Sequence, residues 1–246
     1  MNDLIDQNTT WETSTLGDLC KNNDGLLQTG PFGSQLHAKD YIEFSGIPVI
    51  MPANIGHRSI VSESIKKIKE GDAERLKKHR VEEGDIVYAR RGNIGTHAFI
   101  GSNQRGWLCG TGCLLVRVKD RRILPEYLSF YLLQKRVTNW ILRHAVGTTM
   151  PNLNTTILSK VPISLPPLPE QKVIASILGS LDDKIELNNK MNETLETIAR
   201  ALYKSWFVDF DPVVAKAAGK RPYGMDDETA ALFPDKFVDS ELGPIP

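Results

Sequence analysis

The chain has 246 residues, three cysteines and a formal net charge of zero at pH 7. This length allows one sizeable domain with an appendage, and a core that needs no disulfide or metal for stability. No apolar run is long enough to cross a membrane, and residues 1–10 lack a signal-peptide pattern. These features argue against a membrane protein, and we expect a cytoplasmic one.

The charge is unevenly distributed along the chain. Residues 57–143 hold 18 Lys and Arg against 9 Asp and Glu, while the remaining residues hold 12 against 21. A basic middle on a neutral chain is typical of a nucleic-acid-binding face. A solvated, lysine-rich surface gives the same composition, so charge alone leaves both interpretations open.

We expect residues 1–10 to be flexible and the first domain to begin at Trp11. A loop with two glycines follows at residues 29–36, and glycine allows a backbone to approach a ligand closely. Backbone amides and polar side chains there can contact phosphate or a base edge. The candidate DNA-binding residues of this loop are Gly30, Phe32, Ser34 and Gln35. A tight turn that buries Phe32 in the core explains the same residues equally well.

Short elements are predicted next. Residues 46–51 have the pattern of a strand, and Arg58, in the loop that leaves it, is a further candidate DNA contact. Residues 65–69 alternate like an edge strand with outward lysines, and residues 72–79 predict a short polar helix. Residues 86–89 predict a buried strand.

That buried strand leads directly into a basic corner. Arg90 and Arg91 precede two glycines, with Asn93 between them. One guanidinium can hold a phosphate while the other reaches a guanine edge, and Asn93 can pair with adenine. A surface turn with solvated arginines is the alternative.

Residues 97–100 and 106–118 predict a hairpin that completes a mixed sheet. Cys109 and Cys113 alternate with apolar residues there, which indicates buried strands. A zinc site would need ligands from scattered histidines, so we assign no metal. A second helix is predicted over residues 124–145. It precedes a polar loop whose candidate DNA contacts are Thr148, Thr149 and Asn152.

A strand is predicted at residues 163–165, followed by Pro166-Pro167 and one long helix over residues 168–207. Pro169 suits the first turn of a helix, and no proline follows until Pro212. Apolar residues recur in heptads along two seam positions. The first seam position holds Ile174, Leu181, Asn188, Leu195 and Leu202, and the second holds Leu178, Ile185, Asn192, Ala199 and Trp206.

Two asparagines occupy the middle of this seam, where a polar residue costs stability but fixes register and partner number. We therefore expect an arm that pairs with another long helix. An ordinary core helix with an exposed middle is the alternative. Residues 211–246 form a turn-rich tail with a short helix at 228–233.

Catalytic motifs are missing from the sequence. It contains no phosphate-binding Gly-x-x-x-x-Gly-Lys-Ser/Thr loop, no Asn-Pro-Pro-Tyr motif of adenine methylation and no nuclease-type acidic-x-Lys element. The residues predict a binding protein, and an independent enzyme is the weakest of the hypotheses.

Several motifs carry a family resemblance through their order along the chain. They are Thr29-Gly30-Pro31-Phe32-Gly33-Ser34, Gly46-Ile47-Pro48-Val49-Ile50, Gly84-Asp85-Ile86-Val87, Arg91-Gly92-Asn93-Ile94-Gly95, Gly147-Thr148-Thr149, Pro166-Pro167-Leu168-Pro169-Glu170-Gln171 and Ser205-Trp206-Phe207-Val208-Asp209-Phe210-Asp211-Pro212. With these motifs the chain resembles one half of a Type I restriction-modification specificity subunit.

The resemblance implies a function and a domain plan. An α/β target-recognition domain at residues 11–165 would read double-stranded DNA, and a spacer helix at residues 166–210 would hold adenine methyltransferase subunits. A restriction subunit would join the complex. S-adenosylmethionine, ATP and Mg²⁺ would be bound by the partner subunits, and no cofactor by this chain.

The chain departs from that family in having one recognition domain and one spacer helix. It resembles either a half subunit that pairs with a second copy or another specificity chain, or a truncated reading frame. In the alternative function it is a regulatory scaffold that occupies the methyltransferase with little DNA reading of its own.

Overall fold

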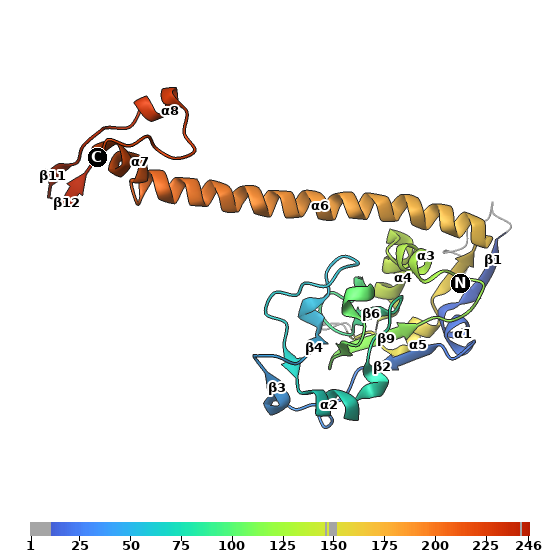
Figure 1. Cartoon of the computed structure of the whole chain (residues 1–246). Helices are drawn as coiled ribbons and strands as arrows, with labels where there is room; N and C mark the ends of the chain where they lie inside the picture. Colours follow the sequence, from blue (N-terminus) through green and yellow to red (C-terminus); the bar gives the residue numbers. More distant parts are fainter. Residues whose placement is uncertain (1–10, 146, 148–151, 242) are drawn as a thin grey trace. The chain divides into compact units, whose positions relative to one another are not determined.

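The computed structural model describes residues 11–145, 147, 152–241 and 243–246, which divide into unit 1, within residues 1–178, and unit 2, within residues 179–246 (Figure 1). The predicted class, mixed α/β sheets followed by a long helix, is confirmed. The elements of unit 1 are β1 (Glu12–Thr15), α1 (Leu16–Lys21), β2 (Leu26–Thr29), β3 (Tyr41–Ile42), β4 (Ile47–Ile50), β5 (Lys67–Ile68), α2 (Glu70–Arg75), β6 (Ile86–Ala89), β7 (His97–Phe99), β8 (Leu108–Cys109), β9 (Cys113–Arg117), α3 (Pro125–Leu132), α4 (Lys135–His144), α5 (Thr155–Ser159), β10 (Pro162–Leu165) and the start of α6 (Leu168–Phe207).

A four-stranded antiparallel sheet in the order β2-β9-β6-β7 forms the centre of unit 1. Side chains of a strand alternate between the two faces of a sheet. In β6, Ile86 and Tyr88 enter one hydrophobic cluster, while Val87 and Ala89 enter another. Both faces of the sheet are therefore covered, which explains why these strands are continuous apolar runs.

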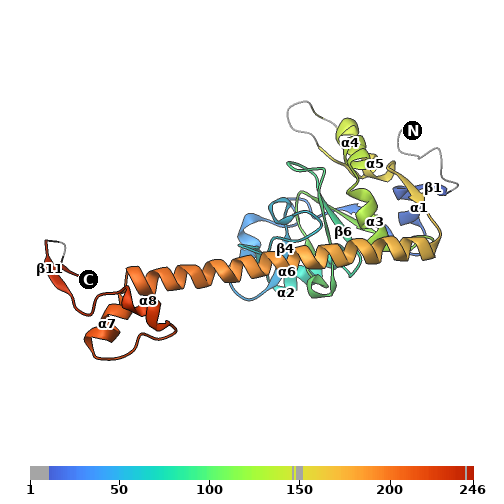
Figure 2. The ribbon, with the colours of Figure 1, turned by 90° about the horizontal axis from the view of Figure 1, so that it is seen from above.

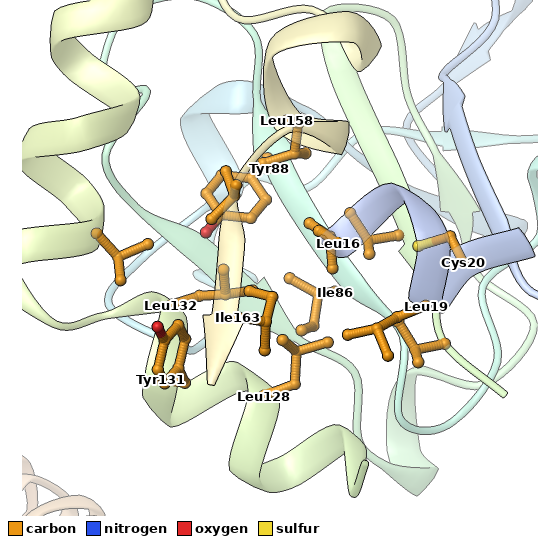
Figure 3. Close-up of a cluster of buried hydrophobic side chains, with 14 of the residues drawn as sticks. Leu16, Leu19, Cys20, Ile86, Tyr88, Leu128, Tyr131, Leu132, Leu158 and Ile163 are labelled. Carbon is orange, nitrogen blue, oxygen red and sulfur yellow. The ribbon is translucent and has the colours of Figure 1, made fainter. Parts of the chain in front are cut away.

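The larger cluster lies between this sheet and the helices α1, α3, α4, α5 and the start of α6. Figure 3 shows its side chains converging from α1, β6, α3, α5 and β10. Its labelled members are Leu16, Leu19, Cys20, Ile86, Tyr88, Leu128, Tyr131, Leu132, Leu158 and Ile163. Burial of each such leucine stabilises the fold by roughly 1.5–3 kcal/mol. Side-chain caps fix the first residues of two of these helices. Thr15 Oγ1 accepts from Asp18 N at the start of α1, and Asn154 Oδ1 accepts from Ile157 N at the start of α5.

A second, mixed sheet in the order β3-β5-β4-β8 packs a smaller cluster around Val49, Ile68 and Leu108. β5 was predicted to be an edge strand, but it lies between β3 and β4, with Ile68 fully buried. The predicted polar helix begins earlier, as α2, and ends in a separate 3-10 turn at Lys77–His79.

Two further predictions are wrong in detail. The predicted hairpin does not form, because β7 and β9 both pair with β6, and β8 instead pairs with β4 in parallel. The predicted helix over residues 124–145 is broken into α3 and α4 at Gln134, whose ψ of 136° is not helical. Leu132 and Val137 would face different sides of a straight helix, and the break lets both enter the core.

The start of α6 is fixed by a buried glutamine. The Gln171 side chain donates to the carbonyl oxygens of Arg122 and Pro166, each at 2.8 Å, and accepts from Leu124 N at 2.8 Å. Ala175 is also buried, and Ile174 packs against the larger cluster. These contacts leave Gln171 without an unsatisfied polar atom and fasten the helix to the rest of unit 1.

α6 has 40 residues and is one unbroken helix, as predicted and as Figures 1 and 2 show. At 1.5 Å per residue it is about 60 Å long. From Leu181 to Lys204 its residues are exposed, with the exception of a half-buried Asp182. Ion pairs such as Glu186–Lys190, one helical turn apart, support the exposed part.

Unit 2 continues with α7 (Asp211–Ala217), α8 (Asp227–Ala231) and a hairpin of β11 (Val238–Ser240) and β12 (Gly243–Ile245). The helix α8 matches the predicted short helix, whereas α7 was not predicted although Pro212 lies in its first turn. Val213 of α7 is fully buried within this unit, and Trp206 packs edge-on against Phe233. Among the described residues, no helix is long and apolar enough to cross a membrane.

Candidate nucleic-acid interface

Three of the predicted DNA-binding segments meet at one end of the sheet β2-β9-β6-β7. β2 and β6 both run antiparallel to β9, so the chain leaves both strands where β9 begins. There Gly30 N donates to Cys113 O at 2.9 Å, and Arg90 N donates to Gly112 O at 2.8 Å. Leu153 N, from the third segment, donates to Arg90 O at 2.9 Å. Residues far apart in the sequence are thus joined by backbone hydrogen bonds.

Close packing of two glycines holds this end together. A Cβ atom on Gly30 would lie 2.0 Å from the carbonyl oxygen of Gly110, a distance that no real side chain tolerates. A Cβ atom on Gly110 would lie 2.7 Å from Ile50 O. The segment Gly110-Thr111-Gly112 therefore belongs to the candidate site, and sequence reasoning missed it. Its only local signal is a Gly-Thr-Gly between two buried strands.

The loop after Gly30 presents an aromatic side chain to solvent. Phe32 is 58% exposed, which rules out the alternative in which this ring lies in the core. Ser34 is exposed as well. Gln35 is half-buried, and its Oε1 accepts from Phe32 N at 3.2 Å. This contact shapes the loop, so Phe32 and Ser34 are the side chains available to a ligand.

In the turn after β6, residues 90–95, one side chain is buried in the core and most of its neighbours are exposed. Ile94 is buried, and its backbone N donates to Gly92 O at 2.9 Å. Gly92 has a φ of +77°, which only glycine adopts easily. Arg91 and Asn93 are exposed, while Arg90 is half-buried with Nε 3.3 Å from Leu153 O. Two arginines are therefore held on a tight turn, as a phosphate- or base-binding corner requires.

Arg58 makes its contacts inside unit 1. Its Nε donates to Ser129 Oγ at 3.0 Å, and its guanidinium lies 3.6 Å from the centre of the Phe130 ring. Ser129 Oγ also lies 2.9 Å from His97 Nε2. Burial, reinforced by the charge of Arg58, lowers the pKa of His97 to about 3, so this ring is neutral. These contacts tie the loop carrying Arg58 to α3 and to β7; its contact with DNA stays a prediction.

The third segment is only partly described. Thr148 and Thr149 lie outside the described residues. Asn152 is half-buried, and within the described ranges its Oδ1 is enclosed without a hydrogen-bond partner. Its position one residue before Leu153 places it beside Arg90.

Some of the excess Lys and Arg residues form ion pairs within the molecule. Arg117 contacts Asp85 and Glu82, each at 2.7 Å, and Arg122 contacts Asp120 at 2.8 Å. The Arg122 guanidinium and other donors hold the pKa of Asp120 well below its usual range. Neither Arg90 nor Arg91 has an ion pair within residues 11–145, 147, 152–241 and 243–246. Their charges are therefore available to an anionic partner.

The α6 seam is used in two ways. Ile174 and Leu178 are half-buried in unit 1, whereas the later seam positions, apart from the half-buried Trp206, are exposed. These exposed predicted interface residues are Leu181, Ile185, Asn188, Asn192, Leu195 and Leu202. Ile177, Met191 and Ile198 widen the same exposed stripe. Long apolar stripes of this kind mark interaction sites in proteins. Within the described residues, no group of three or more His, Cys, Asp or Glu could hold a metal ion.

Comparison with known proteins places this arrangement in a class. The fold is that of Type I restriction-modification specificity subunits: the crystal structure of an S subunit from M. genitalium matches with a TM-score of 0.56 and 17% identity. That match covers 84% of this chain and 48% of the other. The family model described as the Type I restriction modification DNA specificity domain matches residues 8–197. The chain therefore belongs to this family.

Two curated relatives agree with this assignment. The Type I restriction enzyme HindI specificity subunit of Haemophilus influenzae is 30% identical over 226 residues, which cover 90% of this chain and 46% of that protein. The putative MjaX specificity subunit of Methanocaldococcus jannaschii is 29% identical over 96% of this chain and 50% of its own length. The chain spans about half the length of these relatives.

Proposed function

We propose that the chain is a sequence-specific DNA-binding half of a Type I specificity assembly. The observation that carries this proposal is the convergence of Gly30–Gln35, Arg90–Asn93 and Gly110–Gly112 at one end of a rigid sheet. That end presents two arginines, an asparagine and an exposed phenylalanine. Arginine and asparagine form the bidentate contacts to guanine and adenine that read a major groove.

Catalysis would belong to partner subunits. The relatives are named as specificity subunits of restriction enzymes, and the sequence carries none of the methyltransferase, nuclease or phosphate-binding motifs sought above. We infer adenine methyltransferase and restriction subunits as protein partners in the cytoplasm. S-adenosylmethionine, ATP and Mg²⁺ would be bound by those partners.

A second copy of the chain is the proposed partner of α6. In antiparallel coiled coils the two seam positions face each other, and the seam of this helix is symmetric about its two asparagines. One register therefore places Asn188 opposite Asn192 of the second copy, so that polar residues meet each other. Any other register places an asparagine against an apolar residue.

The same register pairs the remaining seam residues. The layers on one side of the asparagines are Ile185 with Leu195, Leu181 with Ala199, Leu178 with Leu202 and Ile174 with Trp206 of the second copy. Two-fold symmetry repeats each layer on the other side. A two-fold assembly reads a two-fold site, so we expect a target of two inverted half-sites separated by an unread spacer.

Binding measurements test the DNA-reading part. The purified chain, alone and with its methyltransferase partner, is titrated with target and random duplexes at several salt concentrations. We expect tighter binding to the target and no methylation or cleavage by the chain alone. Equal affinity for both duplexes, with the methyltransferase still bound, would favour the scaffold alternative. Turnover by the isolated chain that a single carboxylate substitution abolishes would contradict a non-catalytic role.

A further inference from the structure

The charges of α4 are all of one sign. Within the described residues it is the only α-helix that has basic residues and no acidic one. Arg143 and His144 suit the negative end of the helix dipole, but Lys135 and Arg136 lie in the first turn, where the dipole favours acidic side chains. Helix stability therefore does not account for the cations of the first turn, whereas an anionic ligand would.

Two of these four basic side chains make contacts close by in the chain. Arg136 Nε donates to the side chain of the glutamine that precedes the helix, at 2.7 Å. The ring of His144 stacks on that of Trp140, with 3.9 Å between the ring centres. Lys135 and Arg143 are exposed, and neither forms an ion pair with any residue that the structure describes. Their charges are available to a ligand.

The two available cations share one face of the helix. Lys135, Asn139 and Arg143 are four residues apart, which places them in one row, and all three are exposed. This row is the basic face of α4. At 1.5 Å per residue, its two cations are about 12 Å apart along the helix axis. Successive phosphates of one DNA strand advance by about 3.4 Å along the duplex, so the two side chains can reach two separate phosphates.

α4 packs against the turn after β6. Ile94 of that turn belongs to the same hydrophobic cluster as Val137 and Ile141, the buried residues of α4. A Cβ atom on Gly95 would lie 3.9 Å from Thr138 Cβ, which is ordinary van der Waals contact. The helix therefore borders the turn that carries the candidate DNA-binding arginines.

We propose that α4 is a further element of the DNA interface, with its basic face against the phosphate backbone of the duplex. This inference rests on the DNA-reading function proposed above. The face complements phosphate by charge and continues the surface of the turn that holds Arg90 and Arg91. Phosphate contacts fix the register and orientation of a protein on the duplex but carry no sequence information. α4 would thus position the turn, and the turn would read the bases.

Salt titrations of the full-length chain test the phosphate contacts. Lys135→Gln and Arg143→Gln, singly and together, are measured with a duplex of the methylated motif and with a random duplex. The slope of the logarithm of affinity against the logarithm of salt concentration should become shallower by about one in each single variant and by about two in the double variant. Affinity for both duplexes should fall by the same factor. Arg105→Gln, at an exposed arginine near the opposite end of β6 and β7, should leave the slope unchanged.

Photo-crosslinking tests whether the helix touches DNA, and it leaves both cations in place. Asn139, at the centre of the basic face, is replaced by benzoylphenylalanine, and the chain is irradiated with the random duplex at low salt. We expect a crosslink to DNA. Asn103 is the matched control, because it is an exposed asparagine close to Arg105, and the same replacement there should give no crosslink.

The possible failures are distinguishable. If the unsubstituted chain prefers its motif but the α4 variants behave like Arg105→Gln, or residue 139 does not crosslink, the helix is not on the DNA and the proposed function stands. Unchanged DNA binding with weakened binding of the methyltransferase subunit would assign the basic face to an acidic surface of that protein and overturn the proposal. An unsubstituted chain that binds neither duplex would contradict the proposed function, and the role of α4 with it.

Discussion

The two parts of α6 use one sequence pattern in opposite ways. At its start, Gln171 and Ala175 are buried and Ile174 packs against the core of the recognition domain. From Leu181 to Leu202 the same heptad seam is exposed, although its side chains other than Asn188 and Asn192 are equally apolar. Periodicity shows that a helix has an apolar face, but the surrounding chain decides whether that face is covered within the molecule or left for a partner.

The same contrast applies to the candidate DNA site. Gly30, Gly110 and Ile94 are packed inside the recognition domain, whereas Phe32, Arg91 and Asn93 project from it. Substitutions in the packed set should change folding, and substitutions in the projecting set should change binding with the fold intact.

The largest effect is expected from charges in the exposed seam. Leu181→Asp combined with Leu195→Asp should convert the dimer into a folded monomer and abolish methylation at the site. Each buried leucine is worth roughly 1.5–3 kcal/mol, and a two-fold pair loses four of them. Light scattering and circular dichroism measure the outcome. Leu187→Asp is the matched control, because this exposed leucine lies off the seam. A dimer that survives the double substitution would show that the seam is not the interface.

A methyl group at the packed glycine should destabilise the recognition domain. In Gly30→Ala the new Cβ meets Gly110 O at 2.0 Å, so the backbone must shift, at a cost of at least ~1–3 kcal/mol. Urea unfolding measures the loss. Gly33→Ala, in the same loop but with no atom within 4 Å of its Cβ, should change stability by less than about 0.5 kcal/mol. Equal stability of the two variants would contradict the close packing of Gly30 on Gly110.

Removal of an arginine from the turn after β6 should weaken DNA binding without unfolding. Arg91→Ala, and separately Arg90→Ala, should cost roughly 1–3 kcal/mol of specific binding if the side chain reads a base. If the side chain holds a phosphate, the slope of the logarithm of affinity against the logarithm of salt concentration should become shallower by about one. Titrations against salt distinguish these outcomes, with Arg105→Ala as the control. Unchanged affinity and slope in both variants would remove this corner from the interface.

A pH-dependent effect is expected from the buried histidine behind Arg58. The folded-state pKa of His97 is about 3, below the value of 6.5 for a free histidine, so the unfolded chain binds more protons between these values. Stability should therefore fall as the pH drops from about 6.5, by up to ~1.4 kcal/mol per pH unit from this group. His79, whose pKa burial lowers to about 4, adds a similar contribution. The free energy of unfolding, measured with urea at pH 7 and at pH 5, should fall between these two values by an amount that His97→Gln roughly halves. An equal fall in the variant would contradict a neutral His97.

Sequence patterns predicted the features that depend on neighbours along the chain. The period of α6 and the apolar run of β6 are local, and both elements form where they were expected. The break at Gln134 was missed because no glycine or proline marks it; it arises from the need to bury both Leu132 and Val137. Tertiary packing overrides local propensity in such cases.

The candidate site divides in the same way. Arg91 and Asn93 could be selected because a buried strand ends beside them. The close packing of Gly110 could not be predicted, since it depends on the approach of Gly30, eighty residues earlier in the chain. Arg58 was selected as a basic residue in the loop after a strand, but its partners Ser129 and Phe130 lie on a helix about seventy residues away.

A map of methylated adenines, compared between cells with and without this gene, tests the central claim most directly. We expect one methylated motif to disappear with the gene, and that motif to consist of two inverted, identical half-sites around an unread spacer. A two-fold pair of identical recognition domains can read no other kind of site. An asymmetric motif would contradict pairing with a second copy, and maps that do not differ would contradict a role in directing methylation.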